Sequence, residues 1–364
     1  MNSIDRLIKE MCPDGVPFKP LDDFLDYEQP TKYIVESTNY HDVYSTPVLT
    51  AGQTFILGYT DEVSGIYHAS PDNPVIIFDD FTTSHHWVEF DFKVKSSAMK
   101  MLTLRAGAMA DFKYLYYAMT MIRYGPQDHA RQWIATYSKF CIPIPPLEIQ
   151  RAIVEILDRF TELEVELEVE LEARRNQYHY YLKSLLTFSE TVRHVRLGEV
   201  CSSITAGRNV DREASGLYAV YGSTGVIGYT NSDTYNTDSI LVARVGANAG
   251  LVHMARGHYD VSDNTLRLVL NDDYLLKFAY FQLSNMNINQ WAVGGGQPLI
   301  TGKLLKDLLI YLPPIAEQVR IVSILDNFDA LVNDMSIGLP AELAARRKQY
   351  EYYRDRLLTF KEAA

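Results

Sequence analysis

Few residues of this chain are spaced for catalysis. Asp72, followed by Asp91 and Lys93, is the pattern of nucleases in which paired carboxylates hold Mg²⁺ and a lysine lies beside the attacking water. The pattern is short and common by chance, but it keeps a standalone nuclease open as an alternative. Residues 302–304 do not complete a phosphate-binding loop, and residues 73–75 lack the Asn-Pro-Pro-Tyr signature of adenine methyltransferases. The nine histidines show no metal-ligand spacing, so we expect no metal and no catalytic site.

Hydrogen-bonding side chains suited to DNA are more plentiful. In the first part of the chain, residues 81–87 follow the apolar run 75–78 and offer hydroxyl and imidazole groups that can reach base edges and phosphates. An ordinary polar turn is the plain alternative for this loop. The candidates for DNA contact in this part are Thr82, Thr83, Ser84, His85, His86, Arg105, Arg131 and Gln132.

A second set of such side chains lies beyond residue 200. Arginine can bond guanine with two hydrogen bonds and asparagine can do the same with adenine. Arg244 and Asn248 flank Gly246, which allows the backbone to approach a phosphate closely. A solvated surface is the alternative for any one of these residues. The candidates here are Arg208, Ser223, Thr224, Arg244, Asn248, Asn264, Gln297 and Lys303.

A long internal repeat contains the elements that must position these side chains. Residues 145–188 recur at 313–360, and both copies open with Pro-Pro and close with Arg-Arg-x-Gln-Tyr-x-Tyr-Tyr and then Leu-Leu-Thr-Phe. The matches are offset by 168 residues at the start and by 172 at the end, so the copies differ by four residues in length. So long a period is not that of a solenoid. It indicates a two-fold object on one chain, which suits a bipartite target.

Both copies are predicted to be helical. Pro145-Pro146 suits a helix start, and the helix is expected to run over residues 147–188, ~60 Å, which is too long for a compact domain. Two such helices are expected to pack as an antiparallel coiled coil. The second copy is interrupted at residues 336–340, where Pro340 should break or kink it. The apolar stripe of the first copy, at spacings of three and four, is Ile149, Ile153, Leu157, Phe160, Leu163, Leu167 and Leu171.

Three tandem tetrads lie inside the first helix, at residues 161–164, 165–168 and 169–172. Their alternation is typical of a strand, but leucine and glutamate are strong helix formers and both flanks are helical. In a helix their glutamates repel one another at i,i+4, and Val165 and Val169 lie roughly opposite the leucine stripe. We therefore expect a second protein to cover this face. A tandem that tolerates solvent is the alternative.

Two segments of similar size lie outside the helices and are rich in Tyr, Val, Ile, Thr and Gly. They resemble each other faintly: residues 56–61 echo 226–231, and residues 113–117 echo 277–281. We therefore predict an α+β protein in which two mixed α/β domains are separated by the two long helices, with pseudo-two-fold organisation. The expected boundaries are 1–143, 144–190, 191–311 and 312–364.

The net charge of −12 argues against nucleic acid, because neutralising phosphates supplies most non-specific affinity. The four segments carry −6, −5, 0 and −1 in chain order, so DNA binding would need local basic patches or a partner. Cys12, Cys141 and Cys201 form neither a disulfide framework nor a zinc pattern. We expect no signal peptide and no membrane span, and a reducing cytoplasm as the location.

The chain resembles, over essentially its whole length, the specificity subunit of type I restriction-modification enzymes. The resemblance rests on the order globule, helix, globule, helix and on both Pro-Pro-x-x-x-Gln-x-x-Ile-Val-x-Ile-Leu-Asp-x-Phe helix starts. It rests also on residues 338–342 followed by 346–353, and residues 221–225 and 294–298 look like motifs of that family's target recognition domains. The chain departs in one respect, since its first helix lacks the Gly-Leu-Pro break of the second.

The resemblance implies a subunit that is not itself an enzyme. Each globule would be a target recognition domain for one half of a split DNA site, with half-sites about one turn, ~10 bp, apart. The helices would set the spacing and dock two adenine-N6 methyltransferase subunits, to which an ATP-driven translocase-endonuclease subunit can add. No cofactor is implied on this chain; S-adenosylmethionine, ATP and Mg²⁺ belong to the partner subunits. The residues expected to contact partners are Val165, Val169, Arg174, Arg175, Tyr178, Arg346, Arg347 and Tyr350.

A coiled-coil scaffold with no nucleic-acid role is the other alternative, beside the nuclease. Such a scaffold needs helices but not two elaborate globules, so the duplicated segments argue against it. It predicts no DNA retention even with a methyltransferase partner present.

Overall fold

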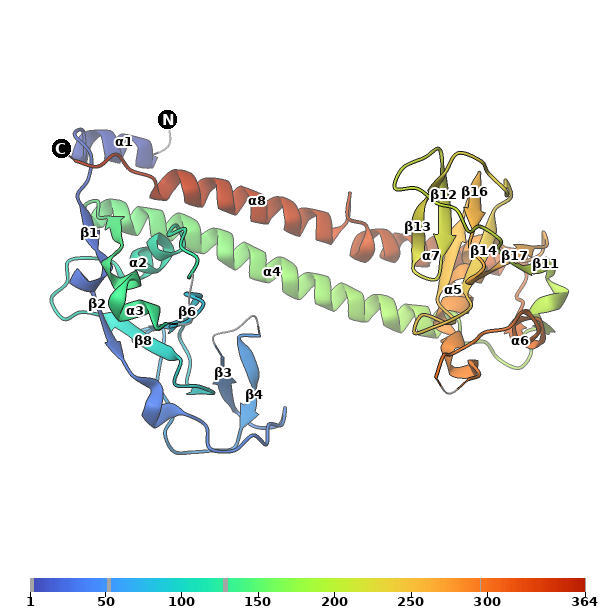
Figure 1. Ribbon diagram of the computed structural model, residues 1–364, viewed down its shortest axis with the longest axis horizontal. Coiled ribbons are helices and arrows are strands. Elements are labelled where there is room, and N and C mark those ends of the chain that lie inside the picture. Colours follow the sequence, from blue (N-terminus) through green and yellow to red (C-terminus); the bar gives the residue numbers. More distant parts are fainter. Residues whose placement is uncertain (1–2, 51–53, 127–129, 295, 364) are drawn as a thin grey trace. The chain divides into compact units, whose positions relative to one another are not determined.

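The computed structural model describes residues 3–50, 54–126, 130–294 and 296–363. It divides into two compact units (Figure 1). Unit 1 contains residues 1–166 and 344–364, and unit 2 contains residues 167–343. In the described parts of the chain, no helix is long and apolar enough to cross a membrane.

Among the described residues of unit 1, three small sheets together form the sheet domain of this unit. Strand β1 (Phe18–Pro20) pairs antiparallel with β9 (Cys141–Pro143). A four-stranded antiparallel sheet has the order β2 (Leu25–Glu28), β8 (Met99–Leu104), β5 (Val75–Asp79) and β6 (His85–Val88). A three-stranded sheet has the order β4 (Ile56–Thr60), β3 (Thr46–Leu49) and β7 (Lys93–Val94), with β3 and β7 parallel.

Unit 2 repeats this topology strand for strand. Strand β10 (His194–Arg196) pairs with β18 (Leu309–Tyr311). The four-stranded sheet has the order β11 (Cys201–Ala206), β17 (Thr265–Leu270), β14 (Ser239–Ala243) and β15 (Val252–Ala255). The three-stranded sheet has the order β13 (Gly225–Thr230), β12 (Tyr218–Gly222) and β16 (Tyr259–Val261), again with its last pair parallel. The faint sequence echo between the two segments therefore reflects a structural duplication.

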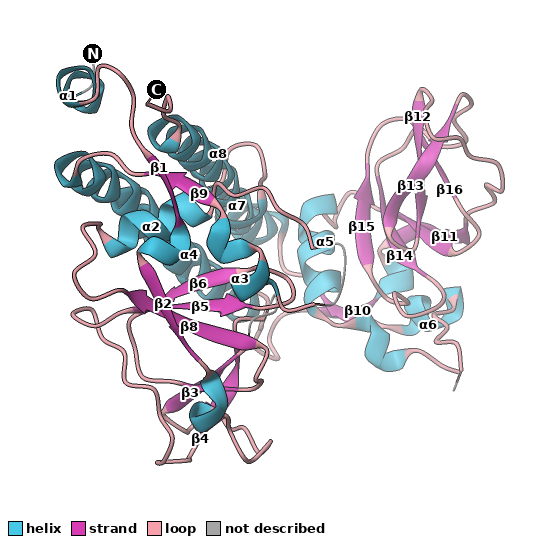
Figure 2. Ribbon diagram, turned by 60° about the vertical axis from the view of Figure 1, so that its left-hand side comes forward, coloured by secondary structure: helices cyan, strands magenta, loops and turns pink. Residues whose placement is uncertain are grey.

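Each four-stranded sheet is the middle layer of its unit. All five residues of β5 are buried: Ile76 and Phe78 face a helical layer, whereas Val75 and Ile77 face the three-stranded sheet. Strand β14 is buried in the same way. Burial on both faces explains why these strands are continuous apolar runs rather than alternating patterns. Figure 2 shows α2 and α3 on one side of the four-stranded sheet of unit 1 and strands β3 and β4 on the other.

Short helices complete the two sheet domains. Unit 1 has α1 (Ser3–Met11), α2 (Phe112–Met119) and α3 (Gln132–Ala135), and unit 2 has α5 (Leu276–Asn285) and α6 (Gly302–Asp307). Asp111 caps α2 by accepting from the backbone N–H of Tyr114. The short 3-10 helices are Leu21–Asp23, Pro30–Tyr33, Tyr137–Lys139, Leu197–Glu199 and Ile288–Trp291.

The two sequence copies form long helices. Helix α4 (Leu147–Leu185) begins directly after Pro145-Pro146, runs unbroken through the tetrads for 39 residues and ends three residues before the predicted Phe188. The second copy is divided into α7 (Ile315–Asn333) and α8 (Leu339–Leu358), as the proline predicts. A Cβ at Gly338 would lie 2.5 Å from the carbonyl oxygen of Ala330, so only glycine fits at this break.

Within each unit, parts of both copies pack side by side and run antiparallel. In unit 1, Phe160 of α4 stacks on Tyr353 of α8, and Glu164 accepts from Arg347 at 2.6 Å. In unit 2, Tyr181 of α4 stacks on Phe328 of α7. Each unit therefore contains the start of one copy and the end of the other.

A buried glutamine anchors each long helix to its sheet domain. In unit 1, Oε1 of Gln150 accepts from the backbone N–H of Asp111 at 2.8 Å, and its Nε2 donates to the carbonyl of Pro145 at 2.7 Å. In unit 2, Oε1 of Gln318 accepts from the backbone N–H of Leu275 at 2.9 Å. Asp111 and Leu275 occupy the N-cap positions of α2 and α5. The glutamine of both Pro-Pro-x-x-x-Gln starts thus holds the same joint in both units.

Candidate nucleic-acid interface

In unit 2, several predicted DNA contacts meet at one end of the four-stranded sheet. Arg244 directly follows β14, and its backbone N–H donates to the carbonyl of Asn264, just before β17, at 2.8 Å. The N–H of Gly246 donates to Pro298, next to Gln297, at 3.0 Å. Arg208 joins the same end, since its N–H donates to Val261 at the end of β16. The structure therefore brings together side chains that lie up to about ninety residues apart in sequence.

The remaining predicted contacts of unit 2 surround this cluster. Ser223 and Thr224 form the turn between β12 and β13, and Ser262 donates to Tyr221 at the end of β12, so this turn lies at the same end. Gln297 is exposed, whereas Gly295 of the predicted glycine turn lies outside the described residues. Lys303 is exposed on α6, which packs on β11.

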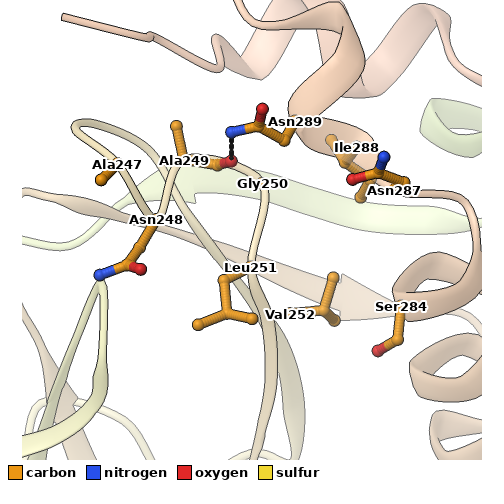
Figure 3. Close-up of a pocket in the computed structure, with 10 residues that line it drawn as sticks. All are labelled: Ala247, Asn248, Ala249, Gly250, Leu251, Val252, Ser284, Asn287, Ile288 and Asn289. Carbon is orange, nitrogen blue, oxygen red and sulfur yellow. Dashed lines mark hydrogen bonds between the residues drawn. The ribbon is translucent and has the colours of Figure 1, made fainter. Parts of the chain in front are cut away.

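A pocket of about 250 Å³ lies beside the turn between β14 and β15 (Figure 3). The amide of Asn289 donates to the carbonyl of Ala249 at 2.7 Å and so holds the turn against the segment that follows α5. Asn248 also lines the pocket, is exposed, and has its side chain pointing away from Asn289. The hydrogen bond from Asn289 anchors the turn, while Asn248 stays accessible to a ligand.

In unit 1, the matching end of the sheet is formed by the turn between β5 and β6. Oδ1 of Asp79 accepts from the backbone N–H groups of Phe81 and Thr82, at 2.7 and 2.8 Å. Thr83 is buried and has φ +61°, a conformation that costs a β-branched residue energy. Thr82 is exposed, and its hydroxyl pairs with that of Ser84 at 2.8 Å. The turn is therefore held in one shape with Thr82 outward.

Two of the predicted loop residues are strand residues instead. His85 and His86 belong to β6, because the turn closes earlier than the polar run suggests. Burial lowers the pKa of His85 to about 4, and Nδ1 of this ring lies 3.2 Å from the carbonyl of Thr83. Burial also lowers the pKa of His86, whose ring stacks on Phe55 with centroids 4.4 Å apart. Both rings are therefore neutral at pH 7 and do not supply positive charge to a phosphate.

The other predicted contacts of unit 1 are divided. Arg131 is exposed beside the turn, because the next residue, Gln132, donates its N–H to the carbonyl of Asp80. The side chain of Gln132 is buried and bonds Ala130 and Tyr124, so the expectation of a groove contact is wrong for this residue. Arg105 follows β8 at the opposite end of the sheet and pairs with Asp26 at 2.9 Å. The structure does not bring Arg105 to the cluster.

Sequence patterns missed three residues at this end of unit 1. Lys95 follows β7 and donates its N–H to Leu49, just as Ser262 follows β16 and donates to Tyr221. Ser96 and Ser97 are exposed and precede β8, at the place that Asn264 marks before β17. The duplication was the available signal, since aligning the two segments would have placed them opposite the residues selected in the second.

Comparison with known proteins decides the family. The family model described as "Type I restriction modification DNA specificity domain" matches residues 13–174 and again residues 189–345. The chain belongs to this family. It is 40% identical to the Type I restriction enzyme EcoR124I/EcoR124II specificity subunit of Escherichia coli. That alignment is 397 positions long and covers 99% of this chain and 98% of the relative. It is 28% identical to the EcoprrI specificity subunit of Escherichia coli, over 73% of each chain.

Solved structures show the same fold. The S subunit of a type I restriction-modification system from M. genitalium matches with a TM-score of 0.64 at 16% identity, over 94% of this chain and 96% of that chain. A chain from a structure of the type I R-M system, concerned with complex assembly and conformational transition, matches with a TM-score of 0.56 over 94% of this chain. The protein is therefore a DNA specificity subunit, which is the non-catalytic component of its system.

The nuclease-like pattern of this specificity subunit does not form a catalytic cluster. Lys93 is 2% exposed and pairs with Glu62 at 2.6 Å, so its amine is not available to a water beside DNA. Asp91 is exposed and bonds His68 at 2.8 Å. Across residues 3–50, 54–126, 130–294 and 296–363, no group of three His, Cys, Asp or Glu side chains is placed to hold a metal. The nuclease alternative is wrong for this site.

The residues predicted to contact partner proteins fall into two groups. Val165 and Val169 are 58% and 65% exposed on α4, and Arg175 is exposed as well. The others already have contacts inside the subunit: Arg174 pairs with Glu170 at 2.7 Å. Two tyrosines lie at the helix contacts, where burial raises the pKa of Tyr178 and raises that of Tyr350 to about 12. Arg346 is half-buried, and Arg347 is exposed and bonds Glu164.

Proposed function

We propose that this specificity subunit reads a bipartite DNA site, with the sheet domain of each unit reading one half. The observation that carries the proposal is that the two units share the same arrangement at one end of the four-stranded sheet. In both units three features meet at one end of the four-stranded sheet, which we call the reading end. They are the residue after β5 or β14, the residues before β8 or β17, and a turn with outward polar side chains. Two like modules on one chain suit two half-sites at a set distance.

The proposed recognition domains are residues 1–143 and 191–311, and the proposed spacer helices are residues 144–190 and 312–364. We propose that the helices pack as an antiparallel coiled coil, set the distance between half-sites and dock two methyltransferase subunits. The exposed Val165 and Val169 support the docking, because apolar side chains between rows of glutamate are poorly placed in solvent. Translocase-endonuclease subunits would join this core, in the cytoplasm.

The contacts with DNA are proposed to come from the exposed residues of each reading end. In the second domain these are Arg208, Thr224, Asn248, Asn264 and Gln297, with the half-buried Ser223 and Arg244 beside them and Lys303 on α6. In the first domain they are Thr82, Ser96, Ser97 and Arg131, with the half-buried Ser84 and Lys95 beside them. A net charge of −12 makes the subunit a weak DNA binder alone, so we expect tight binding only with the methyltransferase subunits. S-adenosylmethionine, ATP and Mg²⁺ are proposed to bind those partners.

A long-read methylome tests the proposal. Cells without other adenine methylation would express this subunit with the methyltransferase of its system. The expected result is N6-methyladenine at one bipartite motif with half-sites about one turn, ~10 bp, apart. Replacing residues 191–311 with the matching segment of a relative should change only one half of the motif. If the two proteins associate but methylate no motif, or if the swap alters both halves, the assignment of one half-site to each domain fails.

A further inference from the structure

Asp80 and Arg244 hold the same place in the two sheet domains. Asp80 directly follows β5, and Arg244 directly follows β14. The backbone N–H of each donates to the carbonyl of the residue just before β8 or β17: Asp80 to Ala98 and Arg244 to Asn264, both at 2.8 Å. The carbonyl of each accepts from a distant segment, from Gln132 and Ile300 respectively, again at 2.8 Å. Four matching hydrogen bonds make the two positions equivalent at the base of the reading end.

The side chains at this position carry opposite charges and differ in burial. Asp80 is 1% exposed, and its Oδ2 lies 2.9 Å from Nζ of Lys100, which has no exposure. Lys100 also donates to Oε1 of Gln29 at 3.1 Å and lies 5.6 Å from the ring centre of Tyr27. Arg244 is half-buried, and among the described residues no carboxylate forms an ion pair with its guanidinium. Only the second domain can therefore present a cation to DNA from this position.

The buried pair Asp80–Lys100 lies at the base of the turn at residues 81–84. Oδ1 of Asp80 accepts from the backbone N–H of Trp133 at 2.9 Å, which ties the start of α3 to the end of β5. The neighbouring Asp79 holds the N–H groups of the turn itself. A buried carboxylate needs a close counter-charge, and Lys100 on β8 supplies it. The pair thus joins β5, β8, the turn and the segment that carries Arg131.

We propose that Asp80 and Lys100 are positioning residues for the first recognition domain. They act by holding the turn at residues 81–84 and Arg131 in place. In the first domain this position is occupied by an internal ion pair, whereas in the second domain Arg244 contacts DNA from the same position. The inference rests on the proposed function. It makes the two half-sites chemically unlike: one is read with an arginine at this position, the other with hydroxyl groups held above a neutralised, buried pair.

The test uses the subunit in complex with its methyltransferase and measures methylation at sites that carry one wrong base pair. The double variant Asp80→Ala with Lys100→Met removes the pair without leaving a buried charge, which proteins often tolerate. The expected result is that discrimination relaxes about five-fold or more at one half-site, the low end of what one mismatched base pair costs. Discrimination at the other half-site should stay as in the wild type, which makes it an internal control for folding. Asp80→Asn with Lys100→Met keeps an acceptor for Trp133 but still lacks the ion pair, so it should recover only part of the discrimination.

Lys93→Met with Glu62→Gln is the matched control, because it removes a second, largely buried ion pair of the same domain. That pair holds residues 36, 37 and 64 instead of the turn. It should lower the melting temperature without relaxing either half-site. If the Ala-Met variant does not assemble, Lys100→Arg, which keeps the charge but not the geometry, should relax the same half-site alone. Three outcomes would overturn the proposal. Discrimination could relax equally at both half-sites, methylation of correct and mismatched sites could fall by the same factor, or the control variant could relax discrimination as well. A wild-type complex that methylates no bipartite site would instead refute the proposed function.

Discussion

The ring of Phe160 stacks on the ring of Tyr353, with centroids 5.4 Å apart and planes inclined by 26°. Phe328 stacks on Tyr181 in the same way, at 5.1 Å and 26°. The two phenylalanines occupy one position of the sequence repeat, and the two tyrosines occupy another. Each copy therefore contributes its phenylalanine to a contact with the tyrosine of the other copy, so that each unit is completed by residues from both copies.

We predict that Phe160→Ala and Phe328→Ala destabilise the protein by similar amounts. Each removes a half-buried ring from an equivalent helix contact, which costs ~2–4 kcal/mol of unfolding free energy. Stacking should contribute ~0.5–1.5 kcal/mol of this in a double-mutant cycle with Tyr353→Ala or Tyr181→Ala. Urea denaturation measures both terms. Tyr353→Phe keeps the ring and should be nearly neutral, whereas a large cost for it would show that the hydroxyl and not the stack stabilises the contact.

Replacing Gln150 or Gln318 should loosen the joint between a long helix and its sheet domain. Gln150→Met leaves the N–H of Asp111 and the carbonyl of Pro145 without their partner, at ~1–3 kcal/mol for each group that stays buried. Hydrogen exchange should report faster exchange at the start of α2. The exposed Gln349→Met on α8 is the control and should change the unfolding free energy by less than ~0.5 kcal/mol.

His85 should make the protein less stable in mild acid. Its folded pKa of about 4 lies below the ordinary value of 6.5, so as pH falls the unfolded chain binds a proton before the folded one does. The stability that the neutral ring contributes is complete above pH 6.5 and is lost as pH falls towards 4, by ~3 kcal/mol in total. His85→Asn keeps a donor for Thr83 but does not titrate. Its unfolding free energy should therefore fall less than that of the wild type between pH 7 and 4.5; parallel curves would contradict the assignment.

Arg244→Ala should relax base selection in one half-site only. A guanidinium that bonds a base edge contributes ~1–3 kcal/mol of discrimination at one base pair. Competition binding of the methyltransferase complex to single-substitution DNA measures it. Lys303→Ala is the contrasting variant, because loss of a phosphate contact weakens binding to all sequences alike and lowers the salt dependence. Uniform weakening by Arg244→Ala would assign this residue to the backbone instead.

Deleting residues 165–168 should shorten the DNA spacer and leave both half-sites unchanged. The four residues are one tetrad, about one helical turn or ~6 Å of α4. The two aromatic stacks lie outside the deletion, so both sheet domains should keep their helix contacts. A methylome of cells that express the deletion variant reads the spacer length directly. Altered half-site sequences would contradict the separation of spacing from base reading.

Helix positions and the duplication were predictable from the sequence because their signals are local or repeated. Pro145-Pro146 and Pro340 mark helix boundaries wherever they occur, since proline lacks the N–H that a helix interior uses. The spacing of the apolar residues placed Ile149, Ile153 and Leu157 in the core, and all three have no exposure. Leu163 follows the same pattern but is 44% exposed, because periodicity gives a face of the helix and not what covers it.

The reading ends were decided by the tertiary structure. Gln132 and Arg131 are neighbours of similar polarity, yet one is buried and the other exposed, because a backbone bond to Asp80, fifty-two residues earlier, turns their segment. The pairing of Asp80 with Lys100 is likewise invisible in sequence, since each residue alone resembles a solvated charge. Hydrogen bonds and ion pairs between distant segments depend on which strands pair and in which register. The local preference of a segment for helix, strand or turn does not contain that information.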